Sequence, residues 1–148
     1  MNAATSTSDS DSILRKLRDS GETVANPADD VRGRKVVDKE GTKVGTVDGL
    51  MIDDAQKKVR FLRVEAGGFL GLGATHLMIP VDAISRITDD EVTIDRSGDH
   101  LKDAPRYDPA LAAEVDEGYW GGVYGYYGFI PYWGIGYRYP LYPYGVRR

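Results

Sequence analysis

Residues 61–80 read Phe61-Leu-Arg-Val-Glu-Ala-Gly-Gly-Phe-Leu-Gly-Leu-Gly-Ala-Thr-His-Leu-Met-Ile-Pro80. Both ends of this stretch mix β-branched, aromatic and aliphatic residues in short runs, which is typical of half-buried strands. Between them, four glycines are interspersed with Phe69, Leu70 and Leu72. Because ordinary turns are polar, these apolar side chains are expected to pack on the domain or on a partner. The stretch therefore predicts two strands joined by a glycine-rich apolar loop.

Short β-type runs separated by polar turns continue on both sides of this stretch. The predicted strands cover residues 31–37, 44–52, 59–65, 76–79 and 91–95, with 81–87 as a short strand or a turn of helix. Around Asp48-Gly49 the apolar positions slip by one residue, which is typical of a β-bulge at a glycine. Residues 91–95 alternate, with Val92 and Ile94 directed inward. The pattern predicts a mainly β fold, a small antiparallel barrel.

The segments outside the barrel divide the chain into four parts. The first twelve residues are too polar to bury a core and are expected to be disordered. Residues 13–19 fit a short helix, either docked on the barrel or used as a basic amphipathic anchor. Asp108-Pro109 opens a second short helix. The predicted division is a polar N-terminal arm with a short helix, the barrel, a short helix and an aromatic tail, over residues 1–29, 30–108, 109–117 and 118–148.

The tail differs from the rest of the chain in charge and in composition. Residues 118–148 hold nine of the ten tyrosines, both tryptophans and eight glycines, with three arginines and no Asp, Glu or Lys. Since the whole chain carries −4, the tail carries +3 and residues 1–117 carry −7. Glycine and proline are expected to preclude a continuous helix here.

So many aromatic side chains are not expected to remain exposed to water, and four roles of the tail are considered. Docking onto a protein or membrane-protein surface is favoured over self-association and over packing on the barrel itself, and an interfacial anchor at a lipid surface is a further option. The candidate interaction residues are Phe69, Leu70, Leu72, Tyr119, Trp120, Tyr124, Tyr126, Tyr127, Phe129, Tyr132, Trp133 and Arg138.

Bulk properties exclude several functional classes. The net charge of −4 argues against nucleic-acid binding, which needs a concentrated basic face. There is no cysteine, so neither a disulfide framework nor a thiolate metal site can form. The first twenty residues lack the pattern of a secretory signal, and no apolar run is long enough to cross a membrane as a helix. We expect a cytoplasmic protein, soluble or peripheral on the inner membrane.

The residues that could carry chemistry do not form a recognisable catalytic pattern. The spacing Gly68-x-x-Gly71-x-Gly73 has the wrong order for a dinucleotide loop, and it leads into a strand where phosphate-binding loops lead into a helix. His76 and His100 lie 24 residues apart and do not have metal-ligand spacing. Paired aspartates occur only in predicted turns, where Asp is favoured for its hydrogen bonding. We therefore expect no enzyme activity, no cofactor and no metal.

Three further segments complete a resemblance to a known family. With Phe61-Leu-Arg-Val, Gly67-Gly-Phe-Leu-Gly-Leu-Gly and His76-Leu-Met-Ile-Pro-Val-Asp-Ala-Ile84, the chain resembles the PRC-barrel family. The likeness extends to Asp30-Val-Arg-Gly-Arg-Lys-Val-Val-Asp38, Gly45-Thr-Val-Asp-Gly-Leu-Met-Ile-Asp53 and Leu101-Lys-Asp-Ala-Pro-Arg-Tyr-Asp-Pro109. The glycine-rich loop and the exit segment are more similar to the photosynthetic reaction-centre H subunit than to ribosome-maturation factors.

The resemblance implies a non-catalytic scaffold that docks on a larger complex, and its first candidate is the cytoplasmic face of a photosynthetic reaction centre. Reaction-centre H subunits usually carry an N-terminal membrane helix, which this chain is expected to replace with a separate anchor or with its tail. The alternatives are a stand-alone barrel of stress or envelope-associated type that self-associates through its tail, and a ribosome-maturation-like protein. Partners implied are a protein complex, a membrane surface or a second copy.

Overall fold

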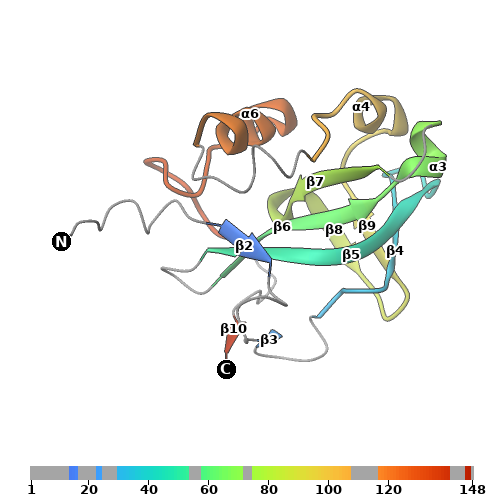
Figure 1. Cartoon of the computed structure of the whole chain (residues 1–148), viewed down its shortest axis with the longest axis horizontal. Helices are drawn as coiled ribbons and strands as arrows, with labels where there is room; N and C mark the ends of the chain where they lie inside the picture. Colours follow the sequence, from blue (N-terminus) through green and yellow to red (C-terminus); the bar gives the residue numbers. More distant parts are fainter. Residues whose placement is uncertain are drawn as a thin grey trace.

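The computed structural model describes residues 14–16, 23–24, 30–53, 58–71, 75–107, 117–140 and 146–147. The chain forms a mainly β domain with a few short helices on one side of the sheet (Figure 1). The strands are β2 Leu14–Lys16, β3 Thr23–Val24, β4 Lys35–Val37, β5 Lys43–Asp53, β6 Lys58–Glu65, β7 His76–Pro80, β8 Ile84–Ile87, β9 Glu91–Ile94 and β10 Val146–Arg147. The helices are α3 Gly67–Leu70, the 3-10 turn η2 Val81–Ala83, α4 Gly98–Lys102 and α6 Glu117–Tyr127.

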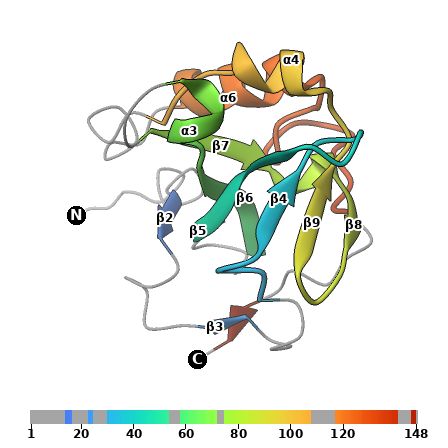
Figure 2. The same cartoon turned by 90° about the vertical axis from the view of Figure 1, so that its right-hand side faces the viewer.

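The main sheet has the strand order β7-β6-β5-β4-β9-β8, and β2 pairs with β5 away from this path. All its pairings are antiparallel except β4 with β9, which run parallel. The sheet curls so that its successive strands turn around a common interior, as the end view in Figure 2 shows. No pairing among the described residues joins β7 to β8, so the barrel is not closed by hydrogen bonds. The mainly β class is confirmed, and the sheet is mixed rather than wholly antiparallel.

The bulge expected at Asp48-Gly49 is confirmed. In the β5–β6 pair, Val47 faces Val64 and Gly49 faces Arg63, so that Asp48 is the extra residue. The inward alternation in β9 is also confirmed, since Val92 and Ile94 are both fully buried. At the first turn, Gly41 has a φ of 89°, the left-handed conformation that glycine adopts without strain.

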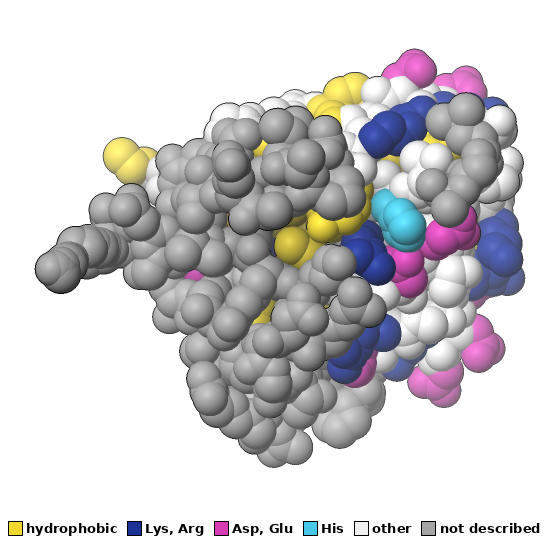
Figure 3. Space-filling model, in the orientation of Figure 1, with side chains coloured by type: hydrophobic (Ala, Val, Ile, Leu, Met, Phe, Trp, Pro, Cys, Tyr) yellow, Lys and Arg dark blue, Asp and Glu magenta, His cyan; other side chains and the backbone are white. Residues whose placement is uncertain are grey.

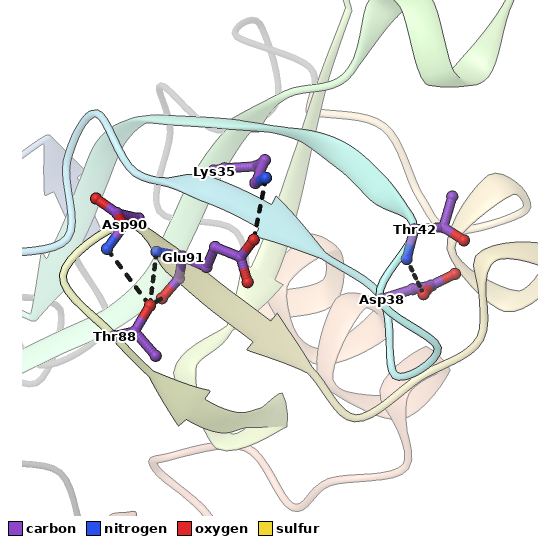
Figure 4. A network of polar contacts seen from close by, with 6 residues as sticks. All are labelled: Lys35, Asp38, Thr42, Thr88, Asp90 and Glu91. Carbon is purple, nitrogen blue, oxygen red and sulfur yellow. Dashed lines mark hydrogen bonds and ion pairs between the residues drawn. The ribbon is translucent and has the colours of Figure 1, made fainter.

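Side chains hold two turns, which lie at opposite ends of the parallel β4–β9 pair (Figure 4). Asp38 is buried, and one of its carboxylate oxygens accepts hydrogen bonds from the backbone nitrogens of Glu40 and Thr42. The Thr88 hydroxyl accepts from the backbone nitrogen of Glu91 at 3.0 Å, and Lys35 reaches the Glu91 carboxylate across the parallel pair at 3.0 Å. These contacts explain why Asp and Thr occur in the turns, with no chemistry required of them.

Gly45 is needed for the close approach of β5 and β6. A methyl group added there would lie 1.9 Å from the backbone oxygen of Glu65, whereas one added at Gly49 would lie 3.5 Å from its nearest neighbour, Nε of Arg63. We expect Gly45→Ala to lower the free energy of unfolding by about 3 kcal/mol, because two backbones would have to separate. Gly49→Ala is the matched control in the same strand and should change stability by less than about 1 kcal/mol. Urea unfolding measures both, and equal stabilities would contradict the register.

One predicted helix near the N-terminus is wrong. Residues 14–16 form β2, which pairs antiparallel with residues 51–53 of β5. A helix of two turns gains little in water, while an edge of β5 offers backbone partners to an extended segment. The predicted disorder of residues 1–12 and the predicted helix over 109–117 fall almost entirely outside the described residues.

The described residues of the tail do not form one continuous helix, as expected from their glycine and proline, but residues 118–127 belong to a helix, α6, that was not predicted. α6 spans eleven residues, and in both views it lies beside α4 over the same side of the sheet (Figures 1 and 2). Its buried side chains have helical spacing: Trp120, Val123, Tyr124 and Tyr127. Burial of three aromatic rings offsets the roughly 1 kcal/mol that each helical glycine costs relative to alanine. The helix belongs to the same buried cluster as the barrel strands.

α6 ends at a C-terminal glycine cap. Gly128 has a φ of 83°, its backbone nitrogen donates to the Gly125 oxygen at 3.1 Å, and the nitrogen of Phe129 donates to the Tyr124 oxygen at 3.0 Å. This pair of bonds is the Schellman motif, which satisfies the last carbonyl groups of a helix. Arg96 also donates to the Tyr127 oxygen and thereby ties the helix end to the barrel.

Candidate interaction surface

Aromatic rings of the C-terminal segment pack against β6 close to a buried ion pair of the barrel. Phe61 of β6 packs against the rings of Trp120 and Tyr124, with centroid distances of 4.7 and 4.9 Å. One residue earlier, Arg60 is 1% exposed and its Nη2 lies 3.1 Å from Oδ2 of the fully buried Asp53. A buried ion pair is stable only when further groups make favourable contacts with its two charges.

Three tyrosines from the C-terminal segment supply those groups. The guanidinium carbon of Arg60 lies 4.3 Å from the ring centroid of Tyr132, 5.3 Å from that of Tyr139 and 5.6 Å from that of Tyr137. Cation–π contacts of this kind are strongest where water is excluded. The Tyr139 hydroxyl also donates to the backbone oxygen of Val59 at 3.0 Å. We call Asp53, Arg60 and these three tyrosines the arginine cage, and it fixes the segment that follows α6.

Burial changes the ionisation of groups around the arginine cage. It raises the pKa of the Tyr124, Tyr137 and Tyr139 hydroxyls, so these phenols are neutral over the physiological pH range. Burial also raises the pKa of the Asp82 carboxyl, against the opposing effects of the Tyr137 hydroxyl and the Arg60 charge. A raised carboxyl pKa alone does not make a catalytic acid.

The loop at residues 128–136 projects from this fixed base. It runs between Gly128 and Gly136, which both have positive φ, and Tyr132 is buried at its base. Ile135 is 100% exposed and Ile130 is 49% exposed, the two exposed large hydrophobic side chains of the described residues. We call residues 128–136 the apolar loop. Figure 3 shows charged side chains over the barrel on the right, and a hydrophobic side chain that projects from the outline at the left.

A shallow pocket lies behind the apolar loop. It has a volume of about 260 Å³ and is lined by Phe129, Ile130, Tyr137 and Arg138 of the C-terminal segment and by Asp82 of the barrel. The guanidinium carbon of Arg96 lies 4.9 Å from the Phe129 ring centroid and covers it from the barrel side. The pocket therefore lies at the interface between the C-terminal segment and the barrel.

The candidate interaction residues fall into four groups: buried, half-buried, exposed, and outside the described residues. Trp120, Tyr124, Tyr127 and Tyr132 are buried in the protein's own core. A half-buried group makes internal contacts: the Tyr119 hydroxyl donates to the Arg106 oxygen, the Tyr126 hydroxyl donates to the His100 oxygen, and Phe129 lies under Arg96. Phe69 and Leu70, in α3, and Trp133 pack partly against the core, Arg138 is exposed, and Leu72 lies outside the described residues.

Sequence reasoning missed three residues that define this surface. Ile130 and Ile135 were overlooked beside so many aromatic residues, although each stands between glycine, proline or aromatic neighbours with no charge close by. Arg60 was placed simply in a strand, because nothing local in the sequence shows that Asp53 and three distant tyrosines surround it. Whether the twelve candidate residues bind a partner stays a prediction.

Three polar side chains, Asp48, Arg63 and His76, form a connected group on the sheet surface. One oxygen of Asp48 accepts from Nε of Arg63 at 2.8 Å, and the other lies 2.7 Å from Nε2 of His76. The Asp48 carboxylate thus joins two cationic or potentially cationic side chains on neighbouring strands. Such a group is a surface ion-pair network, and no nucleophile is seen among its contacts in the described residues.

The described part of the chain contains neither a metal-binding cluster nor a membrane-spanning helix. No group of three or more His, Asp or Glu side chains is placed there to hold a metal ion. None of the helices described has the length and apolar character needed to span a lipid bilayer.

A curled sheet of short strands with a helical cover defines the class of small β-barrel domains. The PRC-barrel domain matches residues 25–101, from directly after β3 into α4, and the chain belongs to this family. No curated protein matches the chain. The family is generally non-catalytic. The match ends before α6, so the aromatic segment lies outside the matched domain.

Proposed function

We propose that this protein is a non-catalytic docking module, in which the barrel holds the apolar loop rigidly for attachment to a larger assembly. The observation that carries the proposal is the full exposure of Ile135 beside the half-exposed Ile130 on an otherwise packed segment. Single exposed hydrophobic side chains are common on protein surfaces. Here they lie within the twenty residues 118–137, which contain no charged side chain at all.

The outer face of α6 extends this uncharged surface. Gly118, Gly122 and Gly125 are exposed there, and a side chain added at Gly122 or Gly125 would meet nothing within 4 Å. Alanine would fit these positions and would stabilise the helix by up to about 1 kcal/mol each. Retaining glycine leaves the helix backbone open to close approach by a partner, which supports docking on this side of the molecule.

The sequence resemblance makes the cytoplasmic face of a photosynthetic reaction centre the first complex to test as partner. The glycine-rich loop and the exit segment support the reaction-centre type over the ribosome-maturation type. The acidic charge of residues 1–117 counts against the RNA contacts of a ribosome factor. Peripheral attachment on the cytoplasmic side of the membrane follows from this choice of partner.

Site-directed photo-crosslinking tests the docking surface in intact cells. With a photoreactive phenylalanine analogue at position 135, we expect covalent adducts with another macromolecule. The same analogue at Ser85, which is exposed on β8, is the matched control and should give at least about tenfold fewer adducts. Equal adduct yields at the two positions would refute docking through the apolar loop.

A further inference from the structure

We infer that the apolar loop inserts Ile130 and Ile135 among the headgroups of a membrane that contains anionic lipids. The inference rests on the proposed function, because it names the surface on which the same loop docks. Its first support is shape. Ile135 projects fully exposed from a turn, and half-exposed Ile130 of the same loop lines only a shallow pocket. A protein partner would need a matching pocket for them, whereas a lipid surface deforms around a projecting apolar tip.

The residues around the tip fit a membrane interface. Trp133 and Tyr137 are half-buried beside the two isoleucines, with their rings partly packed on the protein. Amphipathic rings of this kind favour the boundary between headgroups and acyl chains. The tip is also held in place, since the Trp133 ring packs at 5.0 Å from Tyr132, which the arginine cage fixes. Little conformational freedom is lost when such a loop is inserted.

Charge complementarity selects the anionic lipid. Arg138 is exposed next to the apolar loop, residues 118–137 contain no charged side chain, and residues 1–117 carry −7. A negative surface therefore attracts Arg138 beside the loop and repels the acidic remainder of the chain, which orients the loop toward the lipid. Two acidic side chains lie near: Asp82 is half-buried behind the loop, and exposed Asp95 lies 3.8 Å from Arg96.

The size of the two exposed isoleucine side chains determines how strongly the apolar loop is expected to bind a membrane. Two aliphatic side chains are a smaller anchor than one acyl chain, and one acyl chain alone gives only reversible attachment. Binding should therefore be weak for a single molecule, should grow with the fraction of anionic lipid, and should fall as salt screens the arginines.

Vesicle co-flotation with the purified full-length protein tests the inference. The vesicles contain phosphatidylcholine alone, or phosphatidylcholine and phosphatidylglycerol in equal parts. We expect binding to the mixed vesicles and little binding to the neutral ones. Ile135→Asp should lower the partition coefficient about tenfold or more, because each buried methylene contributes roughly fourfold and a charge is added. Ile135→Leu should retain binding, and Ser85→Asp, which adds the same charge on β8, should reduce it far less.

A second readout places the loop in the lipid. Brominated acyl chains should quench the fluorescence of Trp133 in a Trp120→Phe variant, which leaves one tryptophan. Absence of binding to both vesicles would overturn the inference, as would binding that Ile135→Asp leaves unchanged.

The outcomes separate this inference from the proposed function. Protein adducts from position 135 without vesicle binding would refute lipid insertion and leave docking in place. Dimers that Ile135→Asp disrupts, seen by sedimentation without vesicle binding, would identify a second copy as occupant and likewise refute lipid insertion. Failure of both crosslinking and vesicle binding would refute the docking function itself.

Discussion

Replacing Trp120 by alanine is expected to lower the free energy of unfolding by about 4 kcal/mol, the usual cost of deleting a buried tryptophan. Trp120 is 1% exposed, and its ring lies 4.7 Å from Phe61 and 5.0 Å from Tyr119. Its loss would leave a cavity between α6 and β6 that neither element can close without moving. Urea unfolding followed by circular dichroism gives the change.

The control for this variant is Gly122→Ala, on the opposite face of the same helix. An added methyl group there meets no atom within 4 Å. The variant should therefore keep or raise stability, by up to about 1 kcal/mol, since alanine favours a helix over glycine. A cost below about 1 kcal/mol for Trp120→Ala would mean that α6 is not part of the core.

Arg60→Met is expected to cost about 3 to 5 kcal/mol, because it leaves the Asp53 carboxylate buried without its cation. Asp53 is fully buried, so water cannot replace the lost ion pair. Asp53→Leu should cost a similar amount, since it leaves the Arg60 charge inside the protein. The three tyrosine rings around Arg60 would still pack on a methionine side chain, which separates the loss of charge from the loss of volume.

The double variant Arg60→Met/Asp53→Leu distinguishes the burial of charge from general packing. Replacing both members of a buried ion pair with apolar residues is often neutral or stabilising, so the double variant should regain most of the stability lost in each single variant. Additive losses would show that the two charges do not compensate each other. Losses below about 1 kcal/mol in both single variants would show that Arg60 is solvated.

The local rules that govern strands and turns worked well for residues 30–95. The runs around Val59 to Glu65 and Glu91 to Ile94, the bulge at Asp48 and the turn glycine at 41 are all present in the structure. Each depends on side-chain alternation or on the conformation of one glycine, which the neighbouring residues display directly. The fold class could therefore be predicted from short windows of sequence.

Features that depend on distant residues could not be predicted in this way. The parallel pairing of β4 with β9 joins residues more than fifty positions apart, and hairpin reasoning assumes antiparallel neighbours. The strand β2 forms because β5 provides backbone hydrogen-bond partners along its free edge, although the local sequence pattern resembles a short helix. The arginine cage draws on tyrosines more than seventy residues from Arg60.

The sequence of α6 contains the apolar spacing of a helix, but its glycines conceal that pattern. Trp120, Val123, Tyr124 and Tyr127 have the spacing of an apolar helical face, and Gly128 stands at the expected stop position. Four glycines among residues 118–125 hide this signal, because they lower intrinsic helix propensity. Packing on β6 and β7 decides the outcome, as tertiary contacts commonly do for aromatic segments.

Native-state hydrogen exchange of α6 tests most directly whether the aromatic segment is part of the barrel's fold and so can hold the apolar loop rigidly. We expect the amides of Val123, Tyr124 and Tyr127 to exchange only through global unfolding, with the same free energy as those of Leu62 and Val64 in β6. Exchange of the α6 amides at the rate of an unstructured peptide, with β6 still protected, would contradict a shared core and a rigid base for docking.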